Sequence, residues 1–276
     1  MLRQSPPPHS ISPAPPPPLS PALAPRIKLE FDRDGFCVIP NAITEDDVDL
    51  LRREADALFN AADVDVVAEL GCIVRHMVFV GWHDCARGTS HMRYDFRHRS
   101  SRSRMRTAEA GVFERMVCGT LAGYARAVLL PSPKPGPRLE TIMLYNEQYI
   151  VKPPFQGART AFGWHRDGEY VRDEQRGGSV ACWVALDDVD ETNGTLHIQP
   201  FTAPHCTHQP PIVTIRAQAG TMVILASHVM HCSTPNLSRR FRMCFMPQFF
   251  VRGGGEGEER QGDAEGREGV GLAIPC

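Results

Sequence analysis

The sequence lacks any run of about 18 consecutive apolar residues, which is close to the minimum for a membrane-spanning helix. It also lacks a strong bias of charge, because 30 basic and 32 acidic residues leave a formal net charge of -2. That balance suggests neither a general nucleic-acid binder nor a polybasic membrane protein. We therefore expect a soluble protein without a nucleic-acid partner and without a membrane span.

Paired cysteine motifs are missing as well. The nine cysteines form no CxxC pair and do not follow the spacing of a small disulfide-rich domain. A disulfide framework and a cysteine zinc site are thus disfavoured, and an intracellular, reducing compartment such as the cytoplasm fits best. The N-terminus has no apolar core of a secretory signal, although the acid-free stretch before Glu30 leaves organelle import open.

Two low-complexity tails flank one region that can fold. Residues 1–26 are rich in proline, and residues 253–276 combine glycine with charge and few large apolar side chains. Neither segment can bury a core, so both are predicted to be disordered. Residues 27–252 remain; at about 100–200 residues per domain this length allows one or at most two domains, and we expect one.

Helices are predicted only in the first half of this domain. A strand at residues 36–39 precedes a helix capped by Thr44, with acidic residues in its first turn and a buried stripe of Val48, Leu51, Ala55 and Leu58. A second helix is expected over residues 109–130. Its apolar residues at helical spacing include Val112, Phe113, Met116, Leu121, Tyr124 and Val128.

From Glu140 onward, short apolar and β-branched segments alternate with turn signals. This pattern predicts a mainly β fold with flanking helices, a sandwich or jelly roll rather than a βαβ sheet. The expected strands cover residues 141–145, 148–152, 179–186, 195–199, 212–216, 221–226 and 241–250.

A histidine and an aspartate in FGWHRDGEY suggest a metal site. His165 and Asp167 are two residues apart, so on an extended strand both side chains project from the same face. A second, distant histidine would complete the 2-His-1-carboxylate set of non-haem Fe(II) oxygenases, which leaves coordination positions open. His228 and His231 in ASHVMHCSTPNLSRRFR are both candidates. HxD alone is a weak signal, because a hydrogen-bonded histidine in a turn gives the same pattern.

A buried arginine is predicted shortly after this segment. Arg242 enters the apolar strand RMCFMPQFF, where a charge is costly without an anionic partner. Its guanidinium can bind a carboxylate with two parallel hydrogen bonds, as a dicarboxylate such as 2-oxoglutarate requires. Ser233 could donate its hydroxyl to the same carboxylate. We assign Arg239 and Arg240 to a solvated turn.

These segments resemble the phytanoyl-CoA dioxygenase family. FGWHRDGEY is similar to its W-H-x-D segment, and HCSTPNLSRRFR to its H-G-S-x-x-N-x-S/T-x-x-x-R segment. DGFCVIPNAIT, CWVALDDV and NGTLHIQP also resemble family elements, so the similarity extends with gaps over residues 31–251. The resemblance implies a double-stranded β-helix, a cupin-like jelly roll.

The resemblance also implies roles for individual residues. It places iron on His165, Asp167 and His231, which leaves His228 outside the site. It places Ser233 and Arg242 on 2-oxoglutarate. Trp183 then forms a wall of the pocket, Gln148 contacts the co-substrate, and Arg93 is a poorly aligned counterpart of a further basic residue.

The implied activity is that of an Fe(II)- and 2-oxoglutarate-dependent dioxygenase. Such an enzyme consumes O2, releases succinate and CO2, and hydroxylates a small molecule; ascorbate could stimulate it. Asp167 stands where related halogenases have a small residue that admits chloride, so hydroxylation is favoured. A non-catalytic jelly-roll binding protein that retains the three ligands is the alternative, and a zinc hydrolase is a third reading that Arg242 disfavours.

Two departures from the family pattern concern the surroundings of the site. The family's P-G-S-H is replaced at residues 200–205, near Phe201, and its glycine after the distal histidine is Cys232. The larger residue either constricts the pocket or packs as a small hydrophobe. The substrate class is open; an arginine-rich stretch at residues 87–106 could attract an acyl-CoA or another lipid-like compound, although a solvated loop is the preferred interpretation.

Overall fold

The structure is a computed structural model, and it describes most of the predicted domain. The described residues are 19, 22–60, 73–79, 115–130, 141–155, 157–170, 178–202, 211–252 and 272–273.

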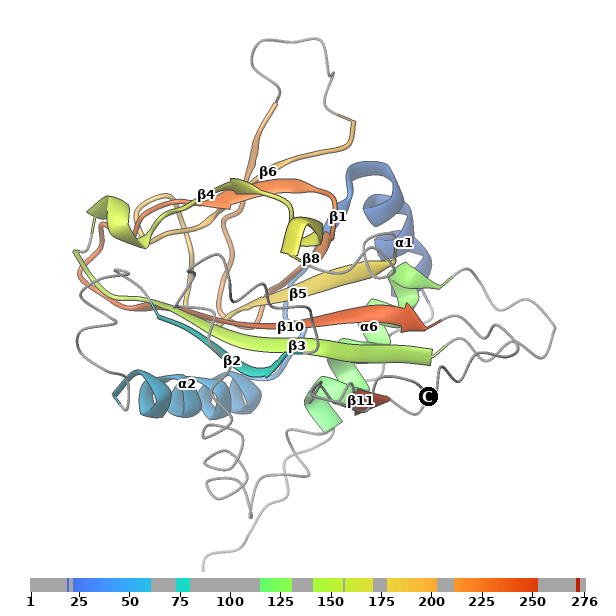
Figure 1. Cartoon of the computed structure of the whole chain (residues 1–276), viewed down its shortest axis with the longest axis horizontal. Helices are drawn as coiled ribbons and strands as arrows, with labels where there is room; N and C mark the ends of the chain where they lie inside the picture. The colour runs from blue at the N-terminus through green and yellow to red at the C-terminus, as the bar shows by residue number, and fades with distance from the viewer. Residues whose placement is uncertain are drawn as a thin grey trace, which may run out of the picture.

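Two antiparallel sheets face each other as layers, with the smaller sheet above the larger one in Figure 1. The order of the larger sheet is β1-β8-β5-β10-β3-β11, and β2 also pairs with β3. Its strands are β1 (Phe36–Ile39), β2 (Ile73–Phe79), β3 (Thr141–Lys152), β5 (Ser179–Ala185), β8 (Met222–Ala226), β10 (Arg242–Arg252) and β11 (Leu272–Ala273).

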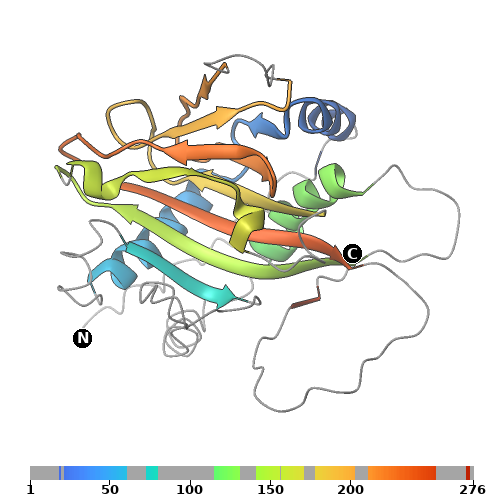
Figure 2. The ribbon, with the colours of Figure 1, turned by 45° about the horizontal axis from the view of Figure 1, so that its top comes forward.

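The smaller sheet has the order β4-β9-β6-β7, and turning the molecule by 45° brings it forward (Figure 2). Its strands are β4 (Phe162–His165), β6 (Leu196–Gln199), β7 (Val213–Thr214) and β9 (Met230–Ser233). Two sheets with these connections form the predicted mainly β jelly roll, the double-stranded β-helix.

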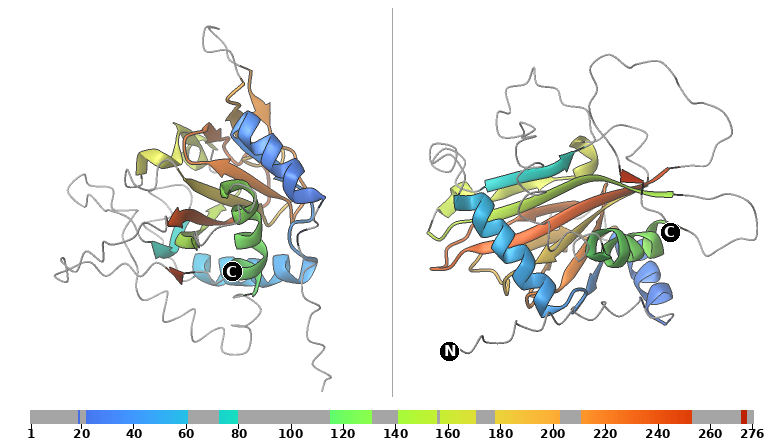
Figure 3. Two further views of the ribbon diagram at one scale, coloured as in Figure 1. Left: turned by 90° about the vertical axis from the view of Figure 1, so that its right-hand side faces the viewer. Right: turned by 90° about the horizontal axis from the view of Figure 1, so that it is seen from below.

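Helices cover the outer face of the larger sheet, as the view from below shows (Figure 3). They are α1 (Leu23–Asp34), α2 (Glu45–Asn60) and α6 (Ala122–Leu129), the last preceded by the π-helix η3 (Arg115–Leu121). Every residue of β5 is buried, because one face meets the helices and the other meets the smaller sheet. Within the described residues, no helix has the length and apolar character that crossing a membrane requires.

Helix α2 forms where the sequence predicts it. The hydroxyl of Thr44 accepts a hydrogen bond from the Asp47 amide at 3.2 Å, and the Asp47 carboxylate in turn accepts one from the Thr44 hydroxyl at 2.7 Å. This reciprocal cap satisfies donors that the first helical turn leaves free. Val48, Leu51 and Ala55 are buried as predicted, whereas the side chain of Leu58 lies outside the described residues.

The folded region begins earlier than predicted. Helix α1 starts at Leu23, inside the segment assigned to the N-terminal tail, and buries Ile27 and Phe31. Pro25 is compatible with this helix because proline lacks only an amide hydrogen that the first turn would leave unpaired. The proline-rich composition therefore led to an incorrect prediction for the residues that begin α1.

Three further strand predictions need correction. Strand β3 runs unbroken through residues 146 and 147, where two separate strands were expected. Strand β2 lies in the stretch for which none was predicted. At the C-terminus, β11 pairs with β3 inside the tail predicted to be disordered. Strands β2 and β11 both pair with β3. Such pairing joins distant segments through backbone hydrogen bonds, which no local sequence pattern indicates.

The predicted second helix is present in part. The chain is a π-helix over Arg115–Leu121 and an α-helix over Ala122–Leu129. Met116, Leu121, Tyr124 and Val128 are buried as the periodicity indicated. Val112 and Phe113 lie outside the described residues.

Candidate metal and co-substrate site

The structure brings His165, Asp167 and His231 together between the two sheets. His165 ends β4, and His231 is its direct cross-strand neighbour on β9. Asp167 does not continue the strand as expected; it is the first residue of a 3-10 turn, η5 (Asp167–Tyr170). The chain bends after His165, and this bend, rather than the alternation of a strand, turns the carboxylate toward both imidazoles.

The three side chains offer one ligand atom each within a small space. The Oδ1 atom of Asp167 lies 3.6 Å from Nε2 of His165 and 3.7 Å from Nε2 of His231. All three ligand atoms lie within 4.8 Å of one another. These separations suit a single cation bound by two nitrogens and one oxygen.

Backbone carbonyls orient the imidazole rings. Nδ1 of His165 lies 2.8 Å from the Gly163 carbonyl oxygen, and Nδ1 of His231 lies 3.1 Å from that of Val229. Since a carbonyl oxygen only accepts, both Nδ1 atoms carry hydrogen. In the neutral rings this leaves the Nε2 lone pairs facing Asp167, as metal-binding histidines require.

Burial and mutual charge shift the pKa values within this cluster. Burial opposes protonation of His165, but the attraction between the protonated ring and the Asp167 carboxylate outweighs it and raises the pKa of His165. In His231 burial dominates and lowers the pKa. Burial also opposes ionisation of Asp167, yet its contacts with both histidines lower the pKa of Asp167 below its ordinary value. The cluster therefore holds an ionised carboxylate in a buried place, which favours a bound cation.

His228 lies outside the cluster and is exposed. Its ring stacks on Phe201, with centroids 4.6 Å apart and planes 15° from parallel. Phe201 in turn lies over Gly35, whose missing side chain makes room for the ring. The substituted loop thus begins by packing against the strand end near β1, whereas residues 203–210 lie outside the described residues.

Arg242 is buried at the start of β10. Its guanidinium carbon lies 5.8 Å from the ring centroid of Trp183, and its Nη1 is 3.2 Å from the sulfur of Cys244. The Nε atom is buried and has no hydrogen-bond partner among the residues that the structure describes. An unpaired donor of a buried cation is costly, so this position fits an anionic ligand beside the tryptophan.

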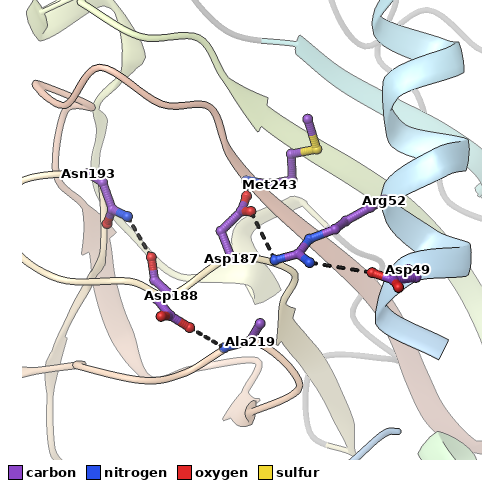
Figure 4. A network of polar contacts seen from close by, with 7 residues as sticks. All are labelled: Asp49, Arg52, Asp187, Asp188, Asn193, Ala219 and Met243. Carbon is purple, nitrogen blue, oxygen red and sulfur yellow. Dashed lines mark hydrogen bonds and ion pairs between the residues drawn. The ribbon is translucent and has the colours of Figure 1, made fainter. Parts of the chain in front are cut away.

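Asp187 feels the charge of Arg242 but forms its hydrogen bonds with other residues. The carboxylate of Asp187 accepts the Met243 amide at 2.7 Å and an Arg52 guanidinium nitrogen at 3.3 Å, as Figure 4 shows. Burial raises the pKa of Asp187, although the hydrogen bond from the Met243 amide and the charge of Arg52 oppose the shift. Asp187 thereby ties α2 to the strand that carries Arg242, and the Nε atom of Arg242 keeps no hydrogen-bond partner among the described residues.

Lys152 adds a second buried cation, which the sequence analysis did not assign to the site. It is the cross-strand neighbour of Arg242 and is fully buried at the end of β3. Its ammonium donates to the Ser233 hydroxyl at 2.6 Å and to the Thr234 carbonyl at 2.7 Å. Ser233 is two residues from His231 on β9, so one strand face links the metal ligands to both cations. The signal in the sequence was a lysine at the end of an apolar strand.

Gly194 makes room for Lys152. A side-chain carbon at Gly194 would lie 2.9 Å from Cδ of Lys152 and 3.0 Å from the Thr234 carbonyl oxygen, and the backbone there has φ of +98°. We expect Gly194→Ala to lower the free energy of unfolding by more than about 1 kcal/mol, because alanine tolerates this φ poorly. Urea denaturation would measure the change; a stability equal to that of the wild type would contradict this role.

Asn236 joins the end of β3 to the turn before β10. Its side-chain nitrogen donates to the carbonyl oxygens of Lys152, Pro153 and Arg240 at 2.9, 3.1 and 2.8 Å. The end of β3 and the turn before β10 are therefore joined through one buried amide. This contact keeps Lys152 and Arg242 in register as neighbours.

Two remaining predicted residues face the interior from the larger sheet. Trp183 is buried on β5, and its ring lies beside the guanidinium of Arg242. Gln148 is buried on β3 opposite Met246, four residues from Lys152 and thus on the same face. Arg93 and the other arginines of residues 87–106 lie outside the described residues.

Cys232 does not point toward the metal ligands. It lies between His231 and Ser233 on β9 and pairs with His197, while its two neighbours pair with Ile198 and Leu196. Because successive side chains of a strand project from opposite faces, Cys232 lies on the far face of the smaller sheet. The choice left open for this residue is resolved, since it does not constrict the pocket.

Gln248 is a further buried residue that sequence reasoning missed. Its side-chain nitrogen donates to Oδ2 of Asp167 at 3.0 Å. The sequence shows it only as one polar residue within an apolar strand. Which side chain it meets depends on how the two sheets stack.

Comparisons with known proteins agree with this geometry. The family model for phytanoyl-CoA dioxygenase matches residues 31–244. A comparison with curated protein sequences finds no significant match.

Several solved structures share the fold. They include the non-heme alpha ketoglutarate dependent epimerase SnoN from nogalamycin biosynthesis, with 16% identity, a TM-score of 0.59, and coverage of 92% of this chain and 96% of that chain. EctD from S. alaskensis with 2-oxoglutarate and 5-hydroxyectoine has 22% identity, a TM-score of 0.54, and coverage of 84% and 76%. The non-heme monooxygenase ThoJ has 18% identity, a TM-score of 0.55, and coverage of 90% and 83%. At these identities the likeness establishes the fold.

Proposed function

Because this chain belongs to the phytanoyl-CoA dioxygenase family, we propose that it is an Fe(II)- and 2-oxoglutarate-dependent oxygenase that hydroxylates a small molecule. The observation that carries the proposal is one continuous strand face on β9. His231 on that face belongs to the three-ligand cluster, and Ser233 on the same face contacts Lys152 beside Arg242. These contacts support our proposal that a metal ion and an anionic co-substrate bind side by side.

The ligand atoms fit iron. Two imidazole nitrogens and one carboxylate oxygen form the set that holds Fe(II) on one face and leaves the other open. His165, Asp167 and His231 would hold Fe(II), which together with 2-oxoglutarate would supply the oxidising chemistry: O2 would be consumed, 2-oxoglutarate would become succinate and CO2, and one oxygen atom would enter the substrate. The donor set also binds zinc, but a zinc hydrolase has no evident use for the buried cations of Arg242 and Lys152.

We call Arg242, Lys152 and Trp183 together the cationic pocket, and its charge fits the distal carboxylate of 2-oxoglutarate. The unpaired Nε atom of Arg242 offers a hydrogen bond, and the forked guanidinium matches a carboxylate. Lys152 contributes a second positive charge and holds the Ser233 hydroxyl in place. The ring of Trp183 covers the guanidinium and keeps water from it, which strengthens these charged contacts.

The test is an anaerobic titration of the purified full-length protein with Fe(II) and then 2-oxoglutarate. Simultaneous binding at neighbouring sites should give the weak visible metal-to-ligand charge-transfer band of such complexes. Its absence in folded protein that has bound Fe(II) would contradict the proposal. Zn(II) with 2-oxoglutarate serves as the matched control, because zinc has no such band.

Turnover separates an enzyme from a binding protein. On admission of O2, an oxygenase forms succinate even without its substrate, whereas a non-catalytic relative gives the band and no succinate. A metabolite panel that includes acyl-CoA and other lipid-like compounds would then identify the substrate through faster succinate formation. Labelled O2 distinguishes hydroxylation from the epimerase and carbocyclase activities named for two structural neighbours: all three would label succinate, but only hydroxylation would also label the product formed from the substrate.

A further inference from the structure

We propose that Gln248 is a positioning residue that determines which carboxylate oxygen Asp167 presents to the metal. The inference rests on the proposed metal site and extends it to a residue that none of the motifs contains. Gln248 acts not through Oδ1 of Asp167, the oxygen that faces the two histidines, but through the other oxygen, Oδ2.

The two oxygens of Asp167 have different surroundings. Oδ1 is the atom that lies 3.6 and 3.7 Å from the two histidine nitrogens. Oδ2 accepts the hydrogen bond from the Gln248 side chain at 3.0 Å. A carboxylate without this contact could turn about its last bond and exchange its oxygens or offer both, since that torsion has a broad energy profile.

The donor comes from the opposite layer of the fold. Gln248 lies on β10 in the larger sheet, opposite Ala181 of β5, whereas Asp167 begins the turn after β4 of the smaller sheet. Both side chains are buried. The hydrogen bond therefore ties η5 to β10, which lies between β5 and β3 in the larger sheet.

The chemical type of residue 248 matters at this position. Because an ionised carboxylate accepts only, the contacting atom of Gln248 is its amide nitrogen. This neutral donor occupies a lone pair of Oδ2 without adding charge to the site. Asp167 is then held as a one-oxygen ligand, and the remaining coordination positions stay open for the co-substrate and O2.

Gln248→Met preserves the length of the side chain and removes the donor, while Gln248→Asn keeps the amide and shortens its reach. Co(II) is the probe, because it binds in air and its visible absorption reports coordination geometry. We expect both variants to bind Co(II) about 10- to 100-fold more weakly than the wild type, as is usual when a hydrogen bond to a metal ligand is lost. Their Co(II) absorption bands should differ from the wild-type bands.

Met246→Leu is the matched control, since Met246 lies two residues away on the same face of β10 and has no polar contact with the ligands. It should bind Co(II) as the wild type does. Wild-type affinity and absorption in Gln248→Met would overturn the proposal, because packing alone would then be enough to orient the Asp167 carboxylate. If Gln248→Met does not fold, the same measurements on Gln248→Asn decide. Failure of the wild type to bind Co(II) would instead overturn the metal site itself.

Discussion

Replacing Asp167 by alanine is expected to reduce succinate formation to the background rate. Asp167 is the carboxylate of the three-ligand cluster, and both histidine nitrogens face its Oδ1 atom. Its loss leaves two neutral imidazoles, which hold a hard divalent cation less well than a set that includes a negative charge. Removing one partner of a buried charge pair costs at least about 3 kcal/mol, so metal affinity should fall roughly 100-fold or more.

Metal titration and succinate release measured on the same preparation would check this result. Glu169→Ala is the matched control, because Glu169 is an exposed carboxylate in the same turn that pairs with Arg166 at 3.4 Å. Glu169→Ala keeps all three ligand residues, so its metal affinity and its rate of succinate formation should equal those of the wild type. Succinate formation by Asp167→Ala at the rate of Glu169→Ala would show that the cluster is not the reaction centre.

Arg242→Met should weaken 2-oxoglutarate binding without destabilising the protein. A buried cation bound to a carboxylate contributes about 2–5 kcal/mol when its removal is measured, which corresponds to a loss of affinity of roughly 30-fold to several thousand-fold. In the ligand-free protein, by contrast, the Nε atom of Arg242 has no hydrogen-bond partner among the described residues. An apolar side chain of similar length there should be neutral or stabilising by about 1–4 kcal/mol.

The opposite signs of these two effects distinguish a ligand-binding arginine from a structural one. Affinity would be measured by the charge-transfer titration, and stability by urea denaturation without metal or 2-oxoglutarate. Arg240→Met is the control, because Arg240 is exposed two residues earlier. A variant at Arg242 that unfolds more easily yet binds 2-oxoglutarate normally would assign the residue to the core instead.

The local elements follow from the sequence where short-range physics decides them. The cap at Thr44, the buried stripe of α2 and the apolar strand β5 depend on residues a few positions apart. The errors arose where the environment is polar or the composition unusual. Asn146 and Glu147 looked like a turn because adjacent polar residues often mark one, yet β3 pairs with β10 through both of them and Glu147 is buried. The prolines before and within the first turn of α1 led to the prediction of a disordered tail there.

The candidate residues could be found in the sequence because their chemistry is costly without a function. An arginine in an apolar strand and a histidine two residues from an aspartate both stand out as residue types, and the family motifs select His231. The geometry expected for His165 and Asp167 was nevertheless wrong, since Asp167 lies in a 3-10 turn.

By itself the sequence determined which residues carry the charges, the imidazoles and the apolar stripes, and therefore the mainly β class of fold and the candidate metal-binding residues. Only the tertiary structure decided that His165 pairs with His231, that Lys152 lies beside Arg242 and that Gln248 reaches Asp167. Strand pairing brings together residues separated by dozens of positions. The free energy of that pairing comes from the whole interface of two strands or two sheets, so no spacing within one segment can encode it.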